Sequence, residues 1–227
     1  CGGFFIERSF GEEPIFPAVF GRYLREMVRQ EYPMEFFIEG GRTRSGKLMS
    51  PRLGVLGMVL DAAELRQNHR EVTLLPIALA YEQVAEERAY AAELGGQPKR
   101  AESFGELVKA RSVLKRRFGR VYLRVGEPIA CSTLVDATDG QPAWSDRTPD
   151  LRKEQLRQLG DRVMHRIGAS MVLLPTSLVA LALLAHHRRG IGDQELRERI
   201  HRFHAFLTRA GLPQAASLDV VDQGVAQ

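Results

Sequence analysis

Cysteine is almost absent from this sequence of 227 residues, in which only Cys1 and Cys131 occur. Two cysteines cannot build a disulfide framework, and their spacing indicates no metal site. So little cysteine is typical of a protein in a reducing compartment that faces the cytoplasm. We therefore predict a chain without structural disulfides and without a metal site.

Long apolar stretches are also absent, since no segment reaches the roughly 18 to 20 uninterrupted apolar residues that a membrane-spanning helix needs. Residues 171–185 come closest, but Pro175 and two hydroxyl residues interrupt them. We predict a buried helix preceded by a turn in this segment. A segment that dips into a membrane surface is the alternative.

An initiating methionine and a leader segment are missing as well. The sequence starts at Cys1 and passes directly into an apolar stretch. This start predicts a fragment of a longer folded unit whose upstream part is not included.

The composition that the sequence does have is that of a globular protein. Hydrophobic residues make up 44% and charged residues 26%, which is enough for a sizeable core. Lysine and arginine number 32 against 28 aspartates and glutamates, so the net charge is +4. This small excess favours anionic partners, among which we expect no nucleic acid.

The order of predicted elements indicates an α/β fold with a mixed, largely parallel sheet flanked by helices and a C-terminal helical extension. Apolar runs predict strands, and apolar residues at helical spacing predict helices. The strands are predicted at residues 3–6, 34–38, 72–80 and 121–125, and the helices at residues 14–31, 55–65, 104–118, 148–167 and 194–207. Because strand, helix and strand alternate, the sheet is expected to be largely parallel.

A segment without periodicity gives the predicted domain boundary. Residues 132–149 are rich in Ser, Thr, Asp, Gly and Pro, which is typical of a loop or linker. We predict a core at residues 1–131 before this segment and a helical region at residues 150–227 after it.

The richest chemistry lies in a polar loop, residues 39–47, directly behind the predicted strand at 34–38. In a parallel α/β sheet, ligands bind at this carboxyl end of the strands. Arginine forks match two phosphate oxygens, lysine adds a point charge, and glycine amides add fixed dipoles. The loop supplies these groups through Gly40, Gly41, Arg42, Arg44 and Lys47. It therefore predicts a site for a phosphate dianion, and Arg8, which also follows an apolar strand, is expected at the same edge.

Two other interpretations of the loop stay open. Basic turns at protein surfaces are common and need not bind anything. Residues 41–47 also match most of the P-loop pattern, which is a glycine, four residues and then Gly-Lys. However, Leu48 stands where Ser or Thr would hold Mg²⁺, and the strand that ends at Glu82 offers no aspartate as a second anchor.

At these positions the sequence resembles the glycerolipid acyltransferases, and within them the glycerol-3-phosphate acyltransferases and their dihydroxyacetone-phosphate relatives. The resemblance covers at least residues 2–129. Residues 3–8 are similar to the second sequence block of the family, residues 37–48 to the third, and residues 74–77 with 81–82 to the fourth.

The resemblance implies a set of site residues. Arg8 takes the role of the arginine that binds the substrate phosphate, and the third block shapes the acceptor site. The implied substrate-binding residues are Arg8, Glu39, Gly40, Gly41, Arg42, Thr43, Arg44 and Lys47, and Pro76 is implied to shape the acyl or acceptor site. The doubled basic residues Arg42 and Arg44 favour glycerol phosphate over lysophosphatidate as the acceptor.

The resemblance also implies a reaction and its partners. The sn-1 hydroxyl of glycerol 3-phosphate would attack an acyl thioester, carried by coenzyme A or by acyl carrier protein, to give lysophosphatidic acid. We expect a membrane lipid surface as a further partner, at the cytoplasmic face of a bacterial inner membrane. Acylation of dihydroxyacetone phosphate or lysophosphatidate, and a non-catalytic module that binds phosphate or lipid headgroups, are the alternatives.

The larger departure from the family is an absence. Its catalytic block consists of His, four further residues and then Asp. In that block the aspartate orients the imidazole, which removes the acceptor's hydroxyl proton. None of the six histidines, which are His69, His165, His186, His187, His201 and His204, has aspartate five positions on. We therefore expect no catalytic residue in this chain, the block to lie upstream, and the chain as given to bind substrate better than it turns it over.

Overall fold

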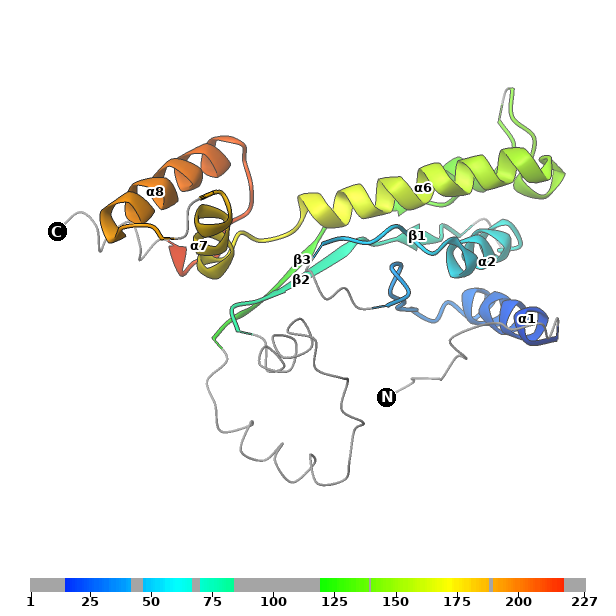
Figure 1. Cartoon of the computed structure of the whole chain (residues 1–227). Helices are drawn as coiled ribbons and strands as arrows, with labels where there is room; N and C mark the ends of the chain where they lie inside the picture. The colour runs from blue at the N-terminus through cyan, green and yellow to red at the C-terminus, as the bar shows by residue number, and fades with distance from the viewer. Residues whose placement is uncertain are drawn as a thin grey trace, which may run out of the picture. The chain divides into compact units, whose positions relative to one another are not determined.

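The structure is a computed structural model that describes residues 15–41, 47–66, 70–83, 119–138, 140–187 and 190–218. Figure 1 shows its helices and strands and labels most of them. The chain divides into two compact units. The first comprises residues 1–43, 48–75 and 127–165, and the second comprises residues 44–47, 76–126 and 166–227.

The core of the first unit forms around helix α2 (Leu53–Glu64). Five of its twelve side chains are buried, namely Leu56, Val59, Leu60, Ala62 and Ala63. Helix α1 (Ile15–Arg29) packs against α2 and adds Phe20 and Leu24 to the buried set. The helices predicted at residues 14–31 and 55–65 are confirmed, and removal of these apolar side chains from water stabilises their packing.

Residues 132–149, predicted as a loop or linker, contain α5 (Ser132–Val135) and the short 3₁₀ helix η2 (Trp144–Asp146). Both pack against α2. Trp144 is only 1% exposed, and its indole Nε1–H donates to Oδ1 of Asp61 on α2 at 2.8 Å. A buried tryptophan with a satisfied N–H fixes this segment to the core of the first unit. The predicted division at this segment into two domains stays a prediction.

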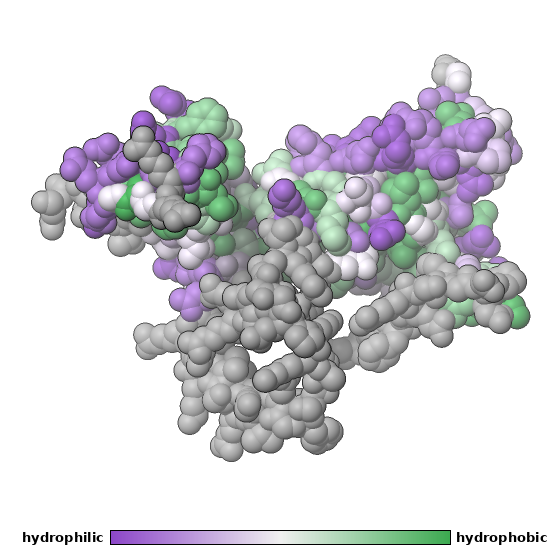
Figure 2. All heavy atoms as spheres, in the orientation of Figure 1, coloured by the Kyte–Doolittle hydropathy of each residue, from purple (hydrophilic) through white to green (hydrophobic). Residues whose placement is uncertain are grey.

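Helix α6 (Pro149–Ala169) confirms the helix predicted at 148–167. It buries Leu159, Val163 and Met164 on one side, while Figure 2 shows its outer side as hydrophilic. Gly160 allows a close approach within the first unit, since a Cβ atom there would lie 2.7 Å from Cδ2 of Leu53. The helix is therefore amphipathic and is held against the start of α2.

The sheets differ from the prediction. Strand β1 (Thr73–Leu74) pairs with β4 (Ile129–Ala130), and β2 (Ile77–Tyr81) pairs with β3 (Val121–Val125). Both pairs are antiparallel, and each sheet of the described residues has two strands. The α/β class holds for the mixture of helices and small sheets, but the prediction of a largely parallel sheet is wrong.

The reason lies in two segments that were predicted as strands. Residues 34–38 form no strand in the structure, so the parallel partner expected from them is missing among the described residues. The run 72–80 is divided at Pro76, which has no amide hydrogen to give to a ladder. Both of its halves pair with the segment 121–130, which runs in the opposite direction. The strand predicted at 3–6 and the helix predicted at 104–118 lie outside the described residues.

The second unit contains α7 (Pro175–Leu184) and α8 (Asp193–Arg209), which pack against each other. The turn and helix predicted within 171–185 and the helix predicted at 194–207 are present, but the prediction that the helix within 171–185 is buried is correct for one side only. One side of α7 is buried through Leu178 and Ala182, while Leu184 on its other side is 82% exposed. In the parts of the chain that the structure describes, no helix has the length and apolar character to cross a membrane.

Candidate functional site

The base of the predicted phosphate loop is closed by two hydrogen bonds. The backbone N–H of Met49 donates to Oε2 of Glu39 at 2.8 Å, across ten residues of sequence. Three residues further on, the N–H of Arg52 donates to the carbonyl oxygen of Ile38 at 2.7 Å. Glu39 is half-buried, and its carboxylate accepts a main-chain N–H from the opposite end of the loop. Together the two bonds hold both ends of the loop together.

Gly40 turns the chain at the start of this loop. Its φ of +63° lies in the left-handed region, and its N–H donates to the carbonyl oxygen of Phe37 at 2.9 Å. A Cβ atom at Gly40 would lie 2.8 Å from Cγ of Arg52. At Gly41 the nearest atom would be Cε of Met49 at an ordinary 3.7 Å. The loop therefore requires glycine at position 40, where the backbone is left-handed and close to a side chain, but not at position 41.

The predicted site residues fall into two groups. Of the nine, the structure describes Glu39, Gly40, Gly41, Lys47 and Pro76, whereas Arg8, Arg42, Thr43 and Arg44 lie outside the described residues. Gly40, Gly41 and Lys47 are exposed to solvent. The convergence of the cations on one phosphate group stays a prediction.

Pro76 is buried in the second unit. Its carbonyl oxygen accepts the N–H of Gly126 at 2.7 Å, next to the first pair of the β2–β3 ladder. A Cβ atom at Gly126 would lie 2.9 Å from Oγ of Ser170 and 3.5 Å from Cβ of Pro76. Pro76 therefore sits in a tightly packed corner, and its predicted role in shaping the acyl or acceptor site stays a prediction.

The sequence assigned Glu82 no role beyond its place in the family block, yet its side chain links the end of β2 to the start of β3. Its carboxylate accepts the backbone N–H of Arg120 and the hydroxyl of Tyr122, each at 2.9 Å. The N–H of Arg120, with the Tyr122 hydroxyl as a further donor, lowers the pKa of Glu82. Gly119 has a φ of +72°, and a Cβ atom there would lie 2.4 Å from this carboxylate. The acid therefore fastens the chain where it enters β3.

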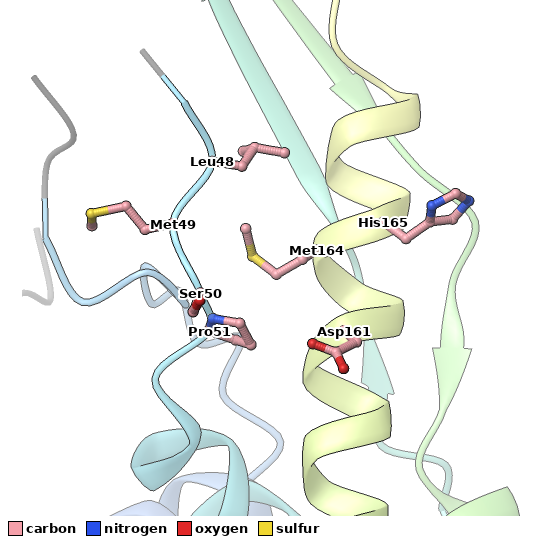
Figure 3. A pocket seen from close by; sticks show the side chains of 7 residues that line it. All are labelled: Leu48, Met49, Ser50, Pro51, Asp161, Met164 and His165. Atoms are coloured by element: carbon pink, nitrogen blue, oxygen red, sulfur yellow. The ribbon is translucent and has the colours of Figure 1, made fainter. Parts of the chain in front are cut away.

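An open groove of about 390 Å³ lies beside the loop, in the first unit. Residues 48–51 form one wall and α6 forms the other, as Figure 3 shows. Its lining consists of Leu48, Met49, Ser50, Pro51, Asp161, Met164 and His165. The groove could not be predicted from the sequence, because its two walls are more than a hundred residues apart and only Leu48 belongs to a motif.

A protein-family model described as the C-terminal region of glycerol-3-phosphate acyltransferase matches residues 90–227, which is more than half of the chain. The chain belongs to the glycerol-3-phosphate acyltransferase family. A second model, described as acyltransferase, matches residues 1–80, which include the loop and its closed base. The resemblance found in the sequence motifs is thereby confirmed for this family.

Curated relatives carry the same family name. A glycerol-3-phosphate acyltransferase of Pseudomonas putida is 36% identical over 212 residues, covering 91% of this chain and 25% of the relative. The corresponding proteins of Pseudomonas entomophila and Pseudomonas syringae are each 34% identical, over 91% and 92% of this chain. The chain spans about a quarter of the length of these curated relatives.

Proposed function

We propose that the chain forms the acceptor-binding part of an enzyme that transfers a fatty acyl group from an acyl thioester to the sn-1 hydroxyl of glycerol 3-phosphate. The product is lysophosphatidic acid, an intermediate of phospholipid biosynthesis. The observation that carries the proposal is the loop at residues 39–49, whose base is closed by Glu39 and whose sequence holds three cations. Membership of the family supports the same assignment.

The chemistry assigned to the loop is positioning. Arg42, Arg44 and Lys47 neutralise the phosphate dianion, and the arginine forks orient it through paired hydrogen bonds. When the phosphate is held in place, the sn-1 hydroxyl is positioned next to the carbonyl carbon of the thioester. The bimolecular reaction then becomes effectively unimolecular.

The reaction itself forms one bond and breaks another. The hydroxyl oxygen attacks the carbonyl carbon, the carbon–sulfur bond breaks, and the thiol leaves with a proton. A general base accepts the hydroxyl proton in such reactions. None of the six histidines precedes an aspartate at the spacing of the family's catalytic block. We assign the proton transfer to no residue of this chain.

Glu39 is assigned a structural part in this site. Its carboxylate accepts the N–H of Met49 at 2.8 Å, so one of its oxygens is directed at the loop's own backbone. A second anion beside the phosphate would repel it. Glu39 therefore acts as a positioning residue that holds the cation-bearing loop in shape.

The remaining partners belong to the same proposal. The donor is acyl coenzyme A or acylated acyl carrier protein, no resident cofactor takes part, and the enzyme works at the cytoplasmic face of a bacterial inner membrane. The exposed apolar side chains of α7, among them Val179, Leu183 and Leu184, support contact with a lipid surface.

Calorimetric titration of the chain with glycerol 3-phosphate tests the binding half. We expect Arg42→Ala to weaken binding at least about tenfold, since it removes charge-assisted hydrogen bonds to the phosphate. Arg157→Ala is the matched control, because Arg157 is an exposed arginine that pairs with Glu154 on the outer side of α6. Equal affinity of wild type and Arg42→Ala would contradict the proposed site.

Formation of lysophosphatidic acid tests the transfer half. It is measured with radiolabelled glycerol 3-phosphate and acyl coenzyme A, in a polypeptide of the relatives' length that includes this sequence. Arg42→Ala is expected to abolish product formation there. Binding without any turnover in that longer polypeptide would favour the alternative of a non-catalytic phosphate or headgroup module. A preference for dihydroxyacetone phosphate or lysophosphatidate as the acceptor would reassign the substrate.

A further inference from the structure

The groove beside the loop has an apolar interior. In Figure 3 the side chains of Leu48 and Met164 point toward each other from its two walls, and Pro51 lies below them. Met164 is 8% exposed and Leu48 is 42% exposed, so the interior is packed at α6 and open toward solvent at the loop. Binding of an apolar ligand removes this surface from water, which stabilises the complex.

The polar residues of the lining lie at its margin. Asp161 on α6 is exposed and pairs with Arg157 one turn away, with 3.4 Å between oxygen and nitrogen. In Figure 3 the imidazole of His165 points away from residues 48–51. The groove therefore offers an uncharged floor with polar groups along its edge, which suits a ligand with an apolar body and a polar end.

The groove and the phosphate loop share a structural element. Met49 lines the groove and gives its N–H to Glu39, and Leu48 directly follows Lys47 in the sequence. The hydrogen bond between Glu39 and Met49 therefore positions both the loop and this wall of the groove. The acceptor has only three carbons, so the acyl chain of the donor must lie close to the place where the acceptor phosphate binds.

We propose that the groove between residues 48–51 and α6 binds the fatty acyl chain of the thioester donor. The proposal rests on the proposed function, because only an acyl donor would bring a long alkyl chain to this place. Met164 suits the task, since an unbranched thioether side chain adapts to a flexible ligand. Leu48 and Met164 thereby become residues that determine which acyl chains are accepted.

The test uses cis-parinaric acid, a fatty acid whose fluorescence rises in apolar surroundings, titrated into the whole 227-residue chain. Met164→Trp fills the groove from α6, and Leu48→Trp fills it from the other wall at a more exposed position that tolerates bulk. Each variant is expected to weaken binding of the probe at least about tenfold, with an unchanged circular dichroism spectrum. Leu65→Trp, which adds the same bulk at an exposed site at the end of α2, away from the groove lining, is expected to leave binding unchanged.

Three results would overturn the proposal. They are no binding of the probe to the wild type, wild-type affinity in both groove variants, and an equal loss in the Leu65→Trp control. Glycerol 3-phosphate is titrated into the same proteins to keep this inference separate from the proposed function. If that ligand fails to bind while the probe behaves as expected, the acceptor site is wrong and the groove still binds an acyl chain.

Discussion

Gly40 and Gly41 are neighbours of identical chemistry in different surroundings. Gly40 has a left-handed backbone and faces the aliphatic stem of Arg52, while Gly41 has ordinary space around it. From the sequence, two glycines before a basic loop are expected to have the same role, which is to offer their backbone amides to the phosphate. The structure separates them, because only one turns the chain where the loop leaves the core.

A pair of alanine substitutions measures that difference. Gly40→Ala is expected to lower the free energy of unfolding by about 1–3 kcal/mol, since it forces an L-residue into the left-handed region and crowds Arg52. Gly41→Ala is expected to change it by less than about 0.5 kcal/mol. Urea unfolding followed by circular dichroism gives both values. A cost for Gly41→Ala as large as that for Gly40→Ala would contradict the described turn.

Glu39 allows a sharper test of whether it positions the loop or binds the ligand. Glutamine keeps a carbonyl oxygen that can accept the N–H of Met49, whereas alanine removes the acceptor. We expect Glu39→Ala to cost about 1 kcal/mol of stability and to weaken glycerol 3-phosphate binding, and Glu39→Gln to retain most of both. Denaturant unfolding and calorimetry provide the two readouts. Equal loss of binding in both variants would mean that the negative charge itself is used.

At the scale of elements, the carboxylate of Glu82 holds together the end of the β2–β3 ribbon where β2 ends and β3 begins. The N–H of Arg120 and the hydroxyl of Tyr122 both donate to Glu82 and stabilise its charged form. The folded-state pKa of this carboxyl is therefore below its ordinary value of 4.5. The contribution of Glu82 to stability is full above about pH 4.5 and is lost as the pH falls through the lowered pKa.

This linkage predicts a difference between two variants in acid. Wild type is expected to lose the contribution of Glu82 as the pH falls below about 4.5, and Glu82→Gln is expected to lose less stability over the same interval, because its amide does not titrate. Tyr122→Phe removes one donor and is expected to raise the pKa of Glu82 toward its ordinary value. Thermal unfolding at several pH values and a carbon NMR titration of the glutamate carboxyl measure these effects. If the carboxyl of Glu82 titrated at its ordinary pKa in the wild type, the proposed stabilisation by Arg120 and Tyr122 would be wrong.

The sequence predicts the helices of this chain better than its strands. The apolar spacing in α1, α2, α6 and α8 is local information, since a helix forms its hydrogen bonds within one segment. A strand needs a partner, and the partners of residues 72–80 are set by where the chain returns. Pro76 lies within the run that was predicted as one strand, and its effect, the division into β1 and β2, depends on which strands lie beside it.

At the scale of the whole molecule, the family could be recognised from motifs, while the groove could not. Residues 37–48 carry a specific pattern of glycine and arginine that can be recognised in the sequence without a structure. Leu48 is the last residue of this pattern, but Met164 lies more than a hundred residues away and belongs to no pattern. Such apolar residues acquire a function only when the fold brings them together. The hydrogen bond from the N–H of Met49 to Glu39 could not be predicted either. Every residue except proline has a main-chain N–H, so the sequence does not indicate which one a carboxylate will bind.

The turn at Gly40 also has a genetic consequence. Every missense change in a glycine codon adds a Cβ atom, and at this position that atom meets both a left-handed backbone and the side chain of Arg52. At the adjacent codon for Gly41, a change to alanine meets only open space and the tip of Met49. In a library of random base substitutions selected for function, codon 40 should therefore stay fixed while codon 41 drifts to small residues.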